Sequence, residues 1–167
     1  MAEALIFNNF GSKSKLFHAS IFKPLNDHLA EFYSTHMTDA PQDREIREQG
    51  TREYIEELER FIDKHSRKFL SLFFEQTYGH TDHGLDEIEG IQEYLSFAAS
   101  ISRNHGTNKA PRIPAHIMAR LSFGAIFSCV IFREWLFPAG VASKQEIFSS
   151  LTDFVIDGLN ANSKPRG

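Results

Sequence analysis

The sequence predicts an all-α fold of about seven or eight helices in one domain. Three observations support this class. Apolar residues recur every three or four positions along most of the chain, and no stretch shows the alternation of a strand. The stretch between Pro114 and Pro138 is almost wholly apolar and has no internal proline. The order Ser-Lys-Gln-Glu from Ser143 to Glu146 is that of a capping box, which marks the start of a helix.

The predicted fold begins with a short helix over residues 1–10, which Gly11 ends as a C-terminal cap. Ser12 is suited to cap the next helix. The apolar stripe of that second helix continues at helical spacing as far as Phe32.

Pro24 lies inside this second helix. Because proline lacks the N–H of an interior helical bond, we expect a kink near Ser20–Ile21. The polar stretch over residues 37–50 is predicted to break the helix.

Two further helices are predicted in the middle of the chain. The first begins at Thr51 and continues to Lys64, with Glu56 and Arg60 four residues apart on a solvated face. The second, more apolar, runs from His65 to Tyr78.

A turn over Gly79–Gly84 precedes an amphipathic helix from Leu85 to Arg103, and a polar loop follows over residues 105–113. The last helix is predicted over Lys144–Leu159, with a frayed tail after it.

The helix from Pro114 to Phe137 is the centre of the predicted architecture. Pro114 suits the first helical position, and the proline after Phe137 ends the helix. Its only full charges are Arg120, Arg133 and Glu134, so it lacks the polar face of a surface helix. A membrane span is the rival interpretation, which these charges and the missing flanking anchors disfavour. We expect one side to pack on the chain and the other to meet a second copy.

Charge and cysteine content limit the function classes. A net charge of −4 argues against nucleic-acid affinity over the whole surface, although it leaves room for a small basic patch. Cys129 is the single cysteine, so no intrachain disulfide can form and a reducing cytoplasm is the expected setting. We expect Cys129 to pack in the apolar helix rather than to react. No basic-then-apolar leader begins the sequence.

Sixteen phenylalanines indicate a large aromatic core or an apolar cavity. Each ring alone is more often core, but together they suggest a flat or apolar small-molecule effector rather than a sugar or an ion. The predicted effector-binding residues are Phe61, Phe69, Phe73, Phe74, Tyr94, Phe97, Phe123 and Phe127. No catalytic motif, cofactor motif or complete metal-ligand set is found, so we expect neither an enzyme nor a cofactor.

The first sixteen residues contain a short and specific pattern: a small residue, an aromatic pair and a Ser-Lys helix cap. The positions in register are Ala4, Ile6, Phe7, Phe10, Ser12, Lys13 and Leu16. This stretch resembles the recognition helix and following turn of TetR-family transcriptional regulators. Phe7 stands where the family more often has Tyr, and Asn9 stands where His or Tyr is common.

The resemblance implies a DNA-binding role for the beginning of the chain. Short polar residues of a recognition helix face base edges, and cations and amides lie near phosphates. Asn8 could pair with adenine, Leu5 could touch a thymine methyl, and Lys13 could bind a phosphate. The predicted DNA-binding residues are Ala2, Glu3, Leu5, Phe7, Asn8, Asn9 and Lys13.

The family architecture divides the chain into three parts. Residues 1–20 would be the remnant of a helix-turn-helix domain, residues 21–162 the effector-binding and dimerisation domain, and residues 163–167 a tail. In the family the last two long helices of each subunit form a four-helix bundle in the dimer. The predicted dimer contacts are Met118, Leu121, Ser122, Ala125, Cys129, Phe132, Ile147, Leu151, Phe154 and Val155.

The resemblance therefore implies a homodimeric repressor in which an effector shifts the helix after Ser12 and alters the spacing of two recognition helices. The family has two more helices before this one, so we expect tight operator binding to need a start upstream of Met1. The alternative function is a stand-alone small-molecule-binding dimer with no DNA role. A helical enzyme using the turn with His80 and His83 is a more distant one, since that spacing is permissive for a metal but not diagnostic.

Overall fold

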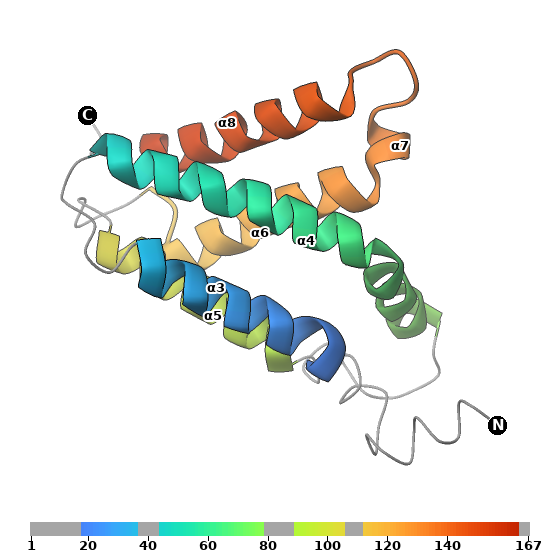
Figure 1. Cartoon of the computed structure of the whole chain (residues 1–167), viewed down its shortest axis with the longest axis horizontal. Helices are drawn as coiled ribbons and strands as arrows, with labels where there is room; N and C mark the ends of the chain where they lie inside the picture. The colour runs from blue at the N-terminus through green and yellow to red at the C-terminus, as the bar shows by residue number, and fades with distance from the viewer. Residues whose placement is uncertain (1–17, 37–43, 79–88, 106–111, 164–167) are drawn as a thin grey trace.

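Six α-helices and one π-helical turn make up the part of the chain that the computed structural model describes, residues 18–36, 44–78, 89–105 and 112–163 (Figure 1). No strand occurs in these ranges, so the predicted all-α class is confirmed. Helix α8 lies along one edge of the molecule and α3 and α5 along the other, with α4 and α6 between them (Figure 1).

The first described element is the π-helical turn η1 (His18–Phe22), which leads directly into α3 (Lys23–His36). Pro24 is the second residue of α3, so the backbone bond that its missing N–H removes falls in the π turn directly before it. The backbone irregularity lies in the turn before the proline, at the predicted position. Ile21 and Leu25 are fully buried, so the π turn and α3 are both anchored in the core.

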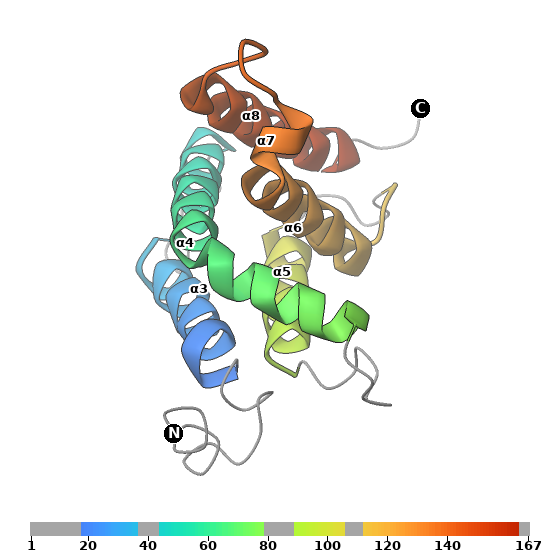
Figure 2. The ribbon, with the colours of Figure 1, turned by 90° about the vertical axis from the view of Figure 1, so that its right-hand side faces the viewer.

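Helix α4 (Arg44–Tyr78) is one continuous element, whereas the sequence predicted a break before Thr51 and two helices meeting at His65. The preceding helix α3 does end at His36, before the polar stretch, but the predicted start at Thr51 is too late and the chain does not divide at His65. No proline interrupts this range, and the buried residues Leu58, Ile62 and Phe69 continue one apolar stripe across the expected junction. The helix bends along its length instead of ending (Figure 2). Helix α5 (Glu89–His105) follows.

The predicted helix from Pro114 to Phe137 is divided in two. Helix α6 (Ala115–Ile131) ends where Phe132 leaves helical geometry, with φ −103° and ψ 24°. A single turn, α7 (Arg133–Leu136), follows.

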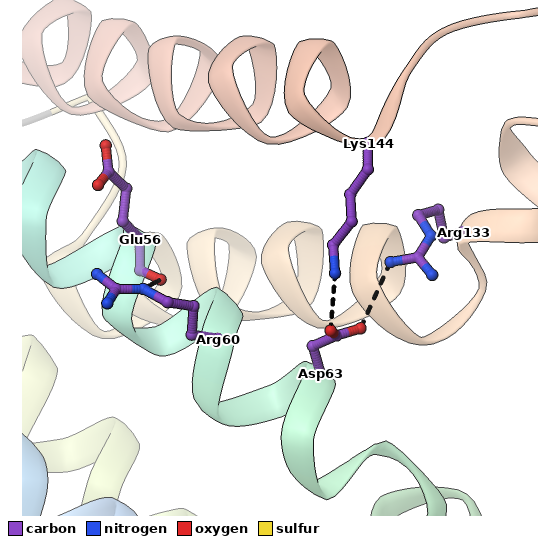
Figure 3. A network of polar contacts seen from close by, with 5 residues as sticks. All are labelled: Glu56, Arg60, Asp63, Arg133 and Lys144. Atoms are coloured by element: carbon purple, nitrogen blue, oxygen red, sulfur yellow. Dashed lines mark hydrogen bonds and ion pairs between the residues drawn. The ribbon is translucent and has the colours of Figure 1, made fainter.

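Two ion pairs to one carboxylate of α4 lie beside this division. The carboxylate of Asp63 binds Arg133 of α7 at 3.4 Å and Lys144, the first residue of α8, at 2.8 Å (Figure 3). These contacts join both ends of the α6–α8 connection to α4. The hydrogen bond from Lys144 is the main cause that lowers the pKa of Asp63.

The predicted capping box at the start of α8 (Lys144–Ser163) is confirmed. The backbone N–H of Ser143 donates to the Glu146 carboxylate at 2.8 Å, and the N–H of Glu146 donates to the Ser143 hydroxyl at 3.2 Å. The helix continues past the predicted end at Leu159. The side chain of Asn162 bonds both the N–H and the carbonyl of Ile113, at 2.6 and 2.9 Å, which ties the end of α8 to the segment before α6.

The hydrophobic core lies between α3, α4, α5, α6 and α8. Helix α6 contacts α4, α5 and α8, so its apolar sequence is largely explained by central packing within the chain. Its fully buried side chains are few: Met118, Ala119, Ile126 and Val130. Most of its other apolar residues are partly buried against the core, and Ile117 and Leu121 are exposed near its beginning.

Candidate functional site

An apolar surface is exposed where α6 and α8 lie side by side. Leu121 on α6 is 57% exposed and Phe154 on α8 is 68% exposed. Between the helices lies an open groove of about 320 Å³ with mainly apolar walls, formed by Met118, Leu121 and Ser122 of α6 and by Phe154, Val155 and Gly158 of α8. No atom lies within 4 Å of the position that a side chain at Gly158 would occupy, so this glycine leaves the groove open. We call this surface the α6/α8 face.

The ten predicted dimer contacts fall into three groups in the structure. Leu121 and Phe154 are exposed on the α6/α8 face, and Met118 and Val155 are buried at the floor of its groove. Four residues are partly buried: Ser122, Ala125, Cys129 and Phe132.

Ile147 and Leu151, by contrast, are buried within the chain's own fold. Their stripe of α8 packs toward α4 and α6, so these two side chains are not available to a partner. The sequence could not separate the two apolar stripes of α8, because both have helical spacing.

A second group of exposed apolar side chains lies on α7 and the segment after it, and sequence reasoning did not single it out. Trp135 is 84% exposed, and Leu136 and Val141 are more than half exposed. The Trp135 ring stacks on Phe132, with centroids 5.7 Å apart. The sequence did not indicate that these side chains are exposed, because it predicted a continuous helix up to Phe137.

The predicted effector residues are only partly brought together. Phe69, Tyr94, Phe123 and Phe127 form one cluster of touching rings, from α4, α5 and α6. The Phe69–Phe127 and Tyr94–Phe123 centroids are both 5.3 Å apart, and Phe123 stacks on Phe127 at 5.8 Å. We call these four residues the aromatic cluster.

The other four predicted effector residues are not among these ring contacts. Phe61 contacts His65, and Phe97 contacts Tyr33. The side chains of Phe73 and Phe74 lie outside the described part of the structure.

A buried hydroxyl pair adjoins the aromatic cluster. The hydroxyls of Tyr54 on α4 and Tyr94 on α5 are 2.7 Å apart, and Tyr94 is 2% exposed. Burial is the main cause that raises the pKa of both phenols, so both remain neutral at physiological pH. Tyr54 was predicted only as part of an apolar stripe, and a single sequence does not show which hydroxyl will find a partner.

No protein-family model, curated protein or solved structure matches this chain.

Glu59 on α4 is a buried acid that sequence reasoning placed with the solvated charges. Its neighbours Glu56 and Arg60 are exposed as expected, but Glu59 is 1% exposed. The Thr152 hydroxyl on α8 lies near its carboxyl group and acts to lower its pKa, and Oε1 has no partner. Burial is the main cause that raises the pKa of Glu59 to about 7. The solvated-face prediction is therefore wrong for this residue.

Several predicted residues lie outside the described ranges. All the predicted DNA-binding residues belong to residues 1–13, and His80 and His83 also fall in a range that is not described. Among the residues that are described, no group of three His, Cys, Asp or Glu side chains is placed to hold a metal. Within the same ranges, no helix has both the length and the apolar character needed to cross a membrane.

Proposed function

We propose that this chain is the effector-binding and dimerisation part of a TetR-like transcriptional repressor. The observation that most favours it is the α6/α8 face, where projecting apolar side chains and an apolar groove occupy the same surface. A two-fold symmetric interface uses one patch on both subunits, so that patch must contain both the projection and the recess that receives it. Leu121 and Phe154 supply projections, and the groove beside them supplies the recess.

The order of the helices also supports the proposal. The resemblance implies that the last two long helices of the chain pair with the same helices of a second subunit. In this chain those helices are α6 and α8. They contact each other and expose one shared apolar side. The helix expected to follow the recognition helix corresponds to η1 and α3, which connect the DNA-binding end to the core.

The aromatic cluster is the proposed effector site, and α3 connects it to the DNA-binding end. Asn26 of α3 donates a hydrogen bond to the Gly90 carbonyl of α5 at 3.0 Å, one helical turn before Tyr94. His28 of α3 lies 3.1 Å from the Glu57 carboxylate of α4. An effector that separates the rings of α4, α5 and α6 would therefore displace groups that position α3. This is an allosteric change of the kind the resemblance implies.

The dimer and the DNA-binding role are tested together on two chains. The first is the present chain, and the second is extended by about 35–45 residues encoded upstream, enough for the two further helices of a helix-turn-helix domain. In sedimentation velocity at micromolar concentration, we expect both to have twice the mass of one chain, which is 19.1 kDa here. In selection from random duplex DNA, only the extended chain should enrich a palindromic site.

The possible failures separate the alternatives. A monomeric present chain would contradict the proposed interface. A dimer whose extended form enriches no DNA, or an upstream frame closed by an early stop codon, would favour the stand-alone small-molecule-binding dimer.

The effector site is tested by thermal unfolding with a panel of flat aromatic compounds. A ligand that binds only the folded state raises the unfolding midpoint as its concentration rises. We expect such a compound to lose its effect in Phe127→Ala, because that ring contacts two others of the aromatic cluster, and to keep it in Phe97→Ala, whose ring lies elsewhere. Equal loss in both variants would contradict the assignment.

A further inference from the structure

Glu59 lies where α4 meets α8 and α6, and one of its two carboxyl oxygens has no hydrogen-bond partner. Thr152 of α8, itself 2% exposed, is the nearby polar group from that helix, and Oε1 is buried with no partner. A buried carboxylate without a counter-ion is costly, and the Thr152 hydroxyl offsets only part of that cost, whereas the neutral carboxyl group does not carry it. The packing of α4 on α8 therefore favours the protonated form of Glu59.

The groups around Glu59 do little to offset a negative charge. On α4, Glu56 opposes it, and Arg60 directs its Nε–H to the Glu56 backbone carbonyl at 3.1 Å on the outer side of the helix (Figure 3). From α6 the neighbouring titratable group is the Cys129 thiol, whose pKa is raised, chiefly by burial. From α8 the neighbour is the uncharged Thr152 hydroxyl.

We propose that Glu59 is a proton-operated latch between α4 and α8: its protonated form holds the helices together, and its ionised form leaves the core and loosens α8. Because α8 supplies half of the α6/α8 face, loosening α8 weakens the homodimer. This second step rests on the proposed function, whereas the latch itself concerns the single chain.

The direction of the pH effect follows from linkage. The pKa of Glu59 is about 7 in the folded chain and near 4.5 without the fold. The extra stability is fully present below about pH 4.5 and is lost as the pH rises through 7. The latch therefore opens in the physiological range.

The central test compares the wild-type chain with Glu59→Gln, an uncharged isostere. The matched control is Glu56→Gln, which removes an exposed carboxylate one turn away on the same helix. Between pH 6 and pH 8, we expect the melting temperature of the wild-type chain to fall by roughly 3–5 °C more than that of Glu59→Gln. Glu56→Gln should retain that fall, with its midpoint moved to a lower pH because a repelling charge is removed. Equal pH dependence in the wild-type chain and Glu59→Gln would overturn the latch.

A direct titration makes the test independent of stability. In carboxyl carbon NMR spectra, the signal missing from Glu59→Gln should titrate with a midpoint near 7, and a midpoint below 5 would overturn the proposal. Thr152→Val removes the hydroxyl that favours the ionised form of Glu59, so it should raise that midpoint. This variant also keeps the proposal testable if Glu59→Gln folds poorly.

The dimer gives a separate readout. The dissociation constant of the wild-type dimer should rise from pH 6 to pH 8, and that of Glu59→Gln should not. A chain that is monomeric at both pH values while Glu59 titrates near 7 would overturn the proposed dimer and leave the latch intact. If the dissociation constant of the dimer does not change with pH, the latch acts within the single chain and does not control the dimer.

Discussion

Leu121→Glu and Phe154→Glu should each convert the proposed dimer to a monomer. Both side chains are more than half exposed in the single chain, so the substitutions should change its own unfolding free energy by no more than about 0.5 kcal/mol. In a two-fold interface each substitution occurs twice and puts an unpaired carboxylate into an apolar contact. With a cost of about 3 kcal/mol per site, the dissociation constant should rise at least a hundredfold.

The measurement is sedimentation velocity over a concentration series, with circular dichroism to show that the fold is intact. Ser149→Glu is the matched control: Ser149 is exposed on α8 one turn before Asp153, which faces α4 through its ion pair with Arg52. This variant should remain dimeric. If Leu121→Glu and Phe154→Glu keep the wild-type mass, the interface lies elsewhere, and the exposed ring of Trp135 is the next surface to test.

Local signals in the sequence predicted the elements whose ends depend on local chemistry. The capping box at Ser143 and Glu146 appears in the structure as two reciprocal hydrogen bonds, because its partners are three residues apart. The division of α6 from α7 at Phe132 could not be predicted in this way. The turn after the division contacts Asp63, which is seventy residues away from Arg133 in sequence, and no periodicity reveals such a partner (Figure 3).

Glu59 shows a different limit, because its position did contain a usable signal. It lies four residues after Ile55 and three before Ile62, both buried, so it falls on the apolar stripe of α4. Its residue type places it with the charges of the helix, whereas its position places it on the buried face. A charged residue in register with a buried stripe is a better indicator of a buried functional group than charge alone.

The candidate dimer face was predictable as a property of two helices but not residue by residue. Helix α8 has apolar residues on two sides, and the sequence placed Ile147 and Leu151 at the interface together with Phe154. In the structure only Phe154 of these three is exposed. Which stripe faces inward is decided by α4 and α6, which pack on α8 from elsewhere in the chain.

Tyr54→Phe should lower the unfolding free energy by about 1–3 kcal/mol, because it leaves the buried hydroxyl of Tyr94 without its partner at 2.7 Å. The double variant Tyr54→Phe/Tyr94→Phe removes both hydroxyls, so no buried polar group is left unpaired, and it should be at least as stable as Tyr54→Phe alone. Urea unfolding of the wild type, both single variants and the double variant gives the coupling free energy directly. Additive losses would show that each hydroxyl has another partner.

A strong coupling would also predict how an effector is recognised. A flat molecule that enters beside Phe123 must offer the displaced Tyr94 hydroxyl a polar atom, since leaving it unpaired would cost as much as the substitution does.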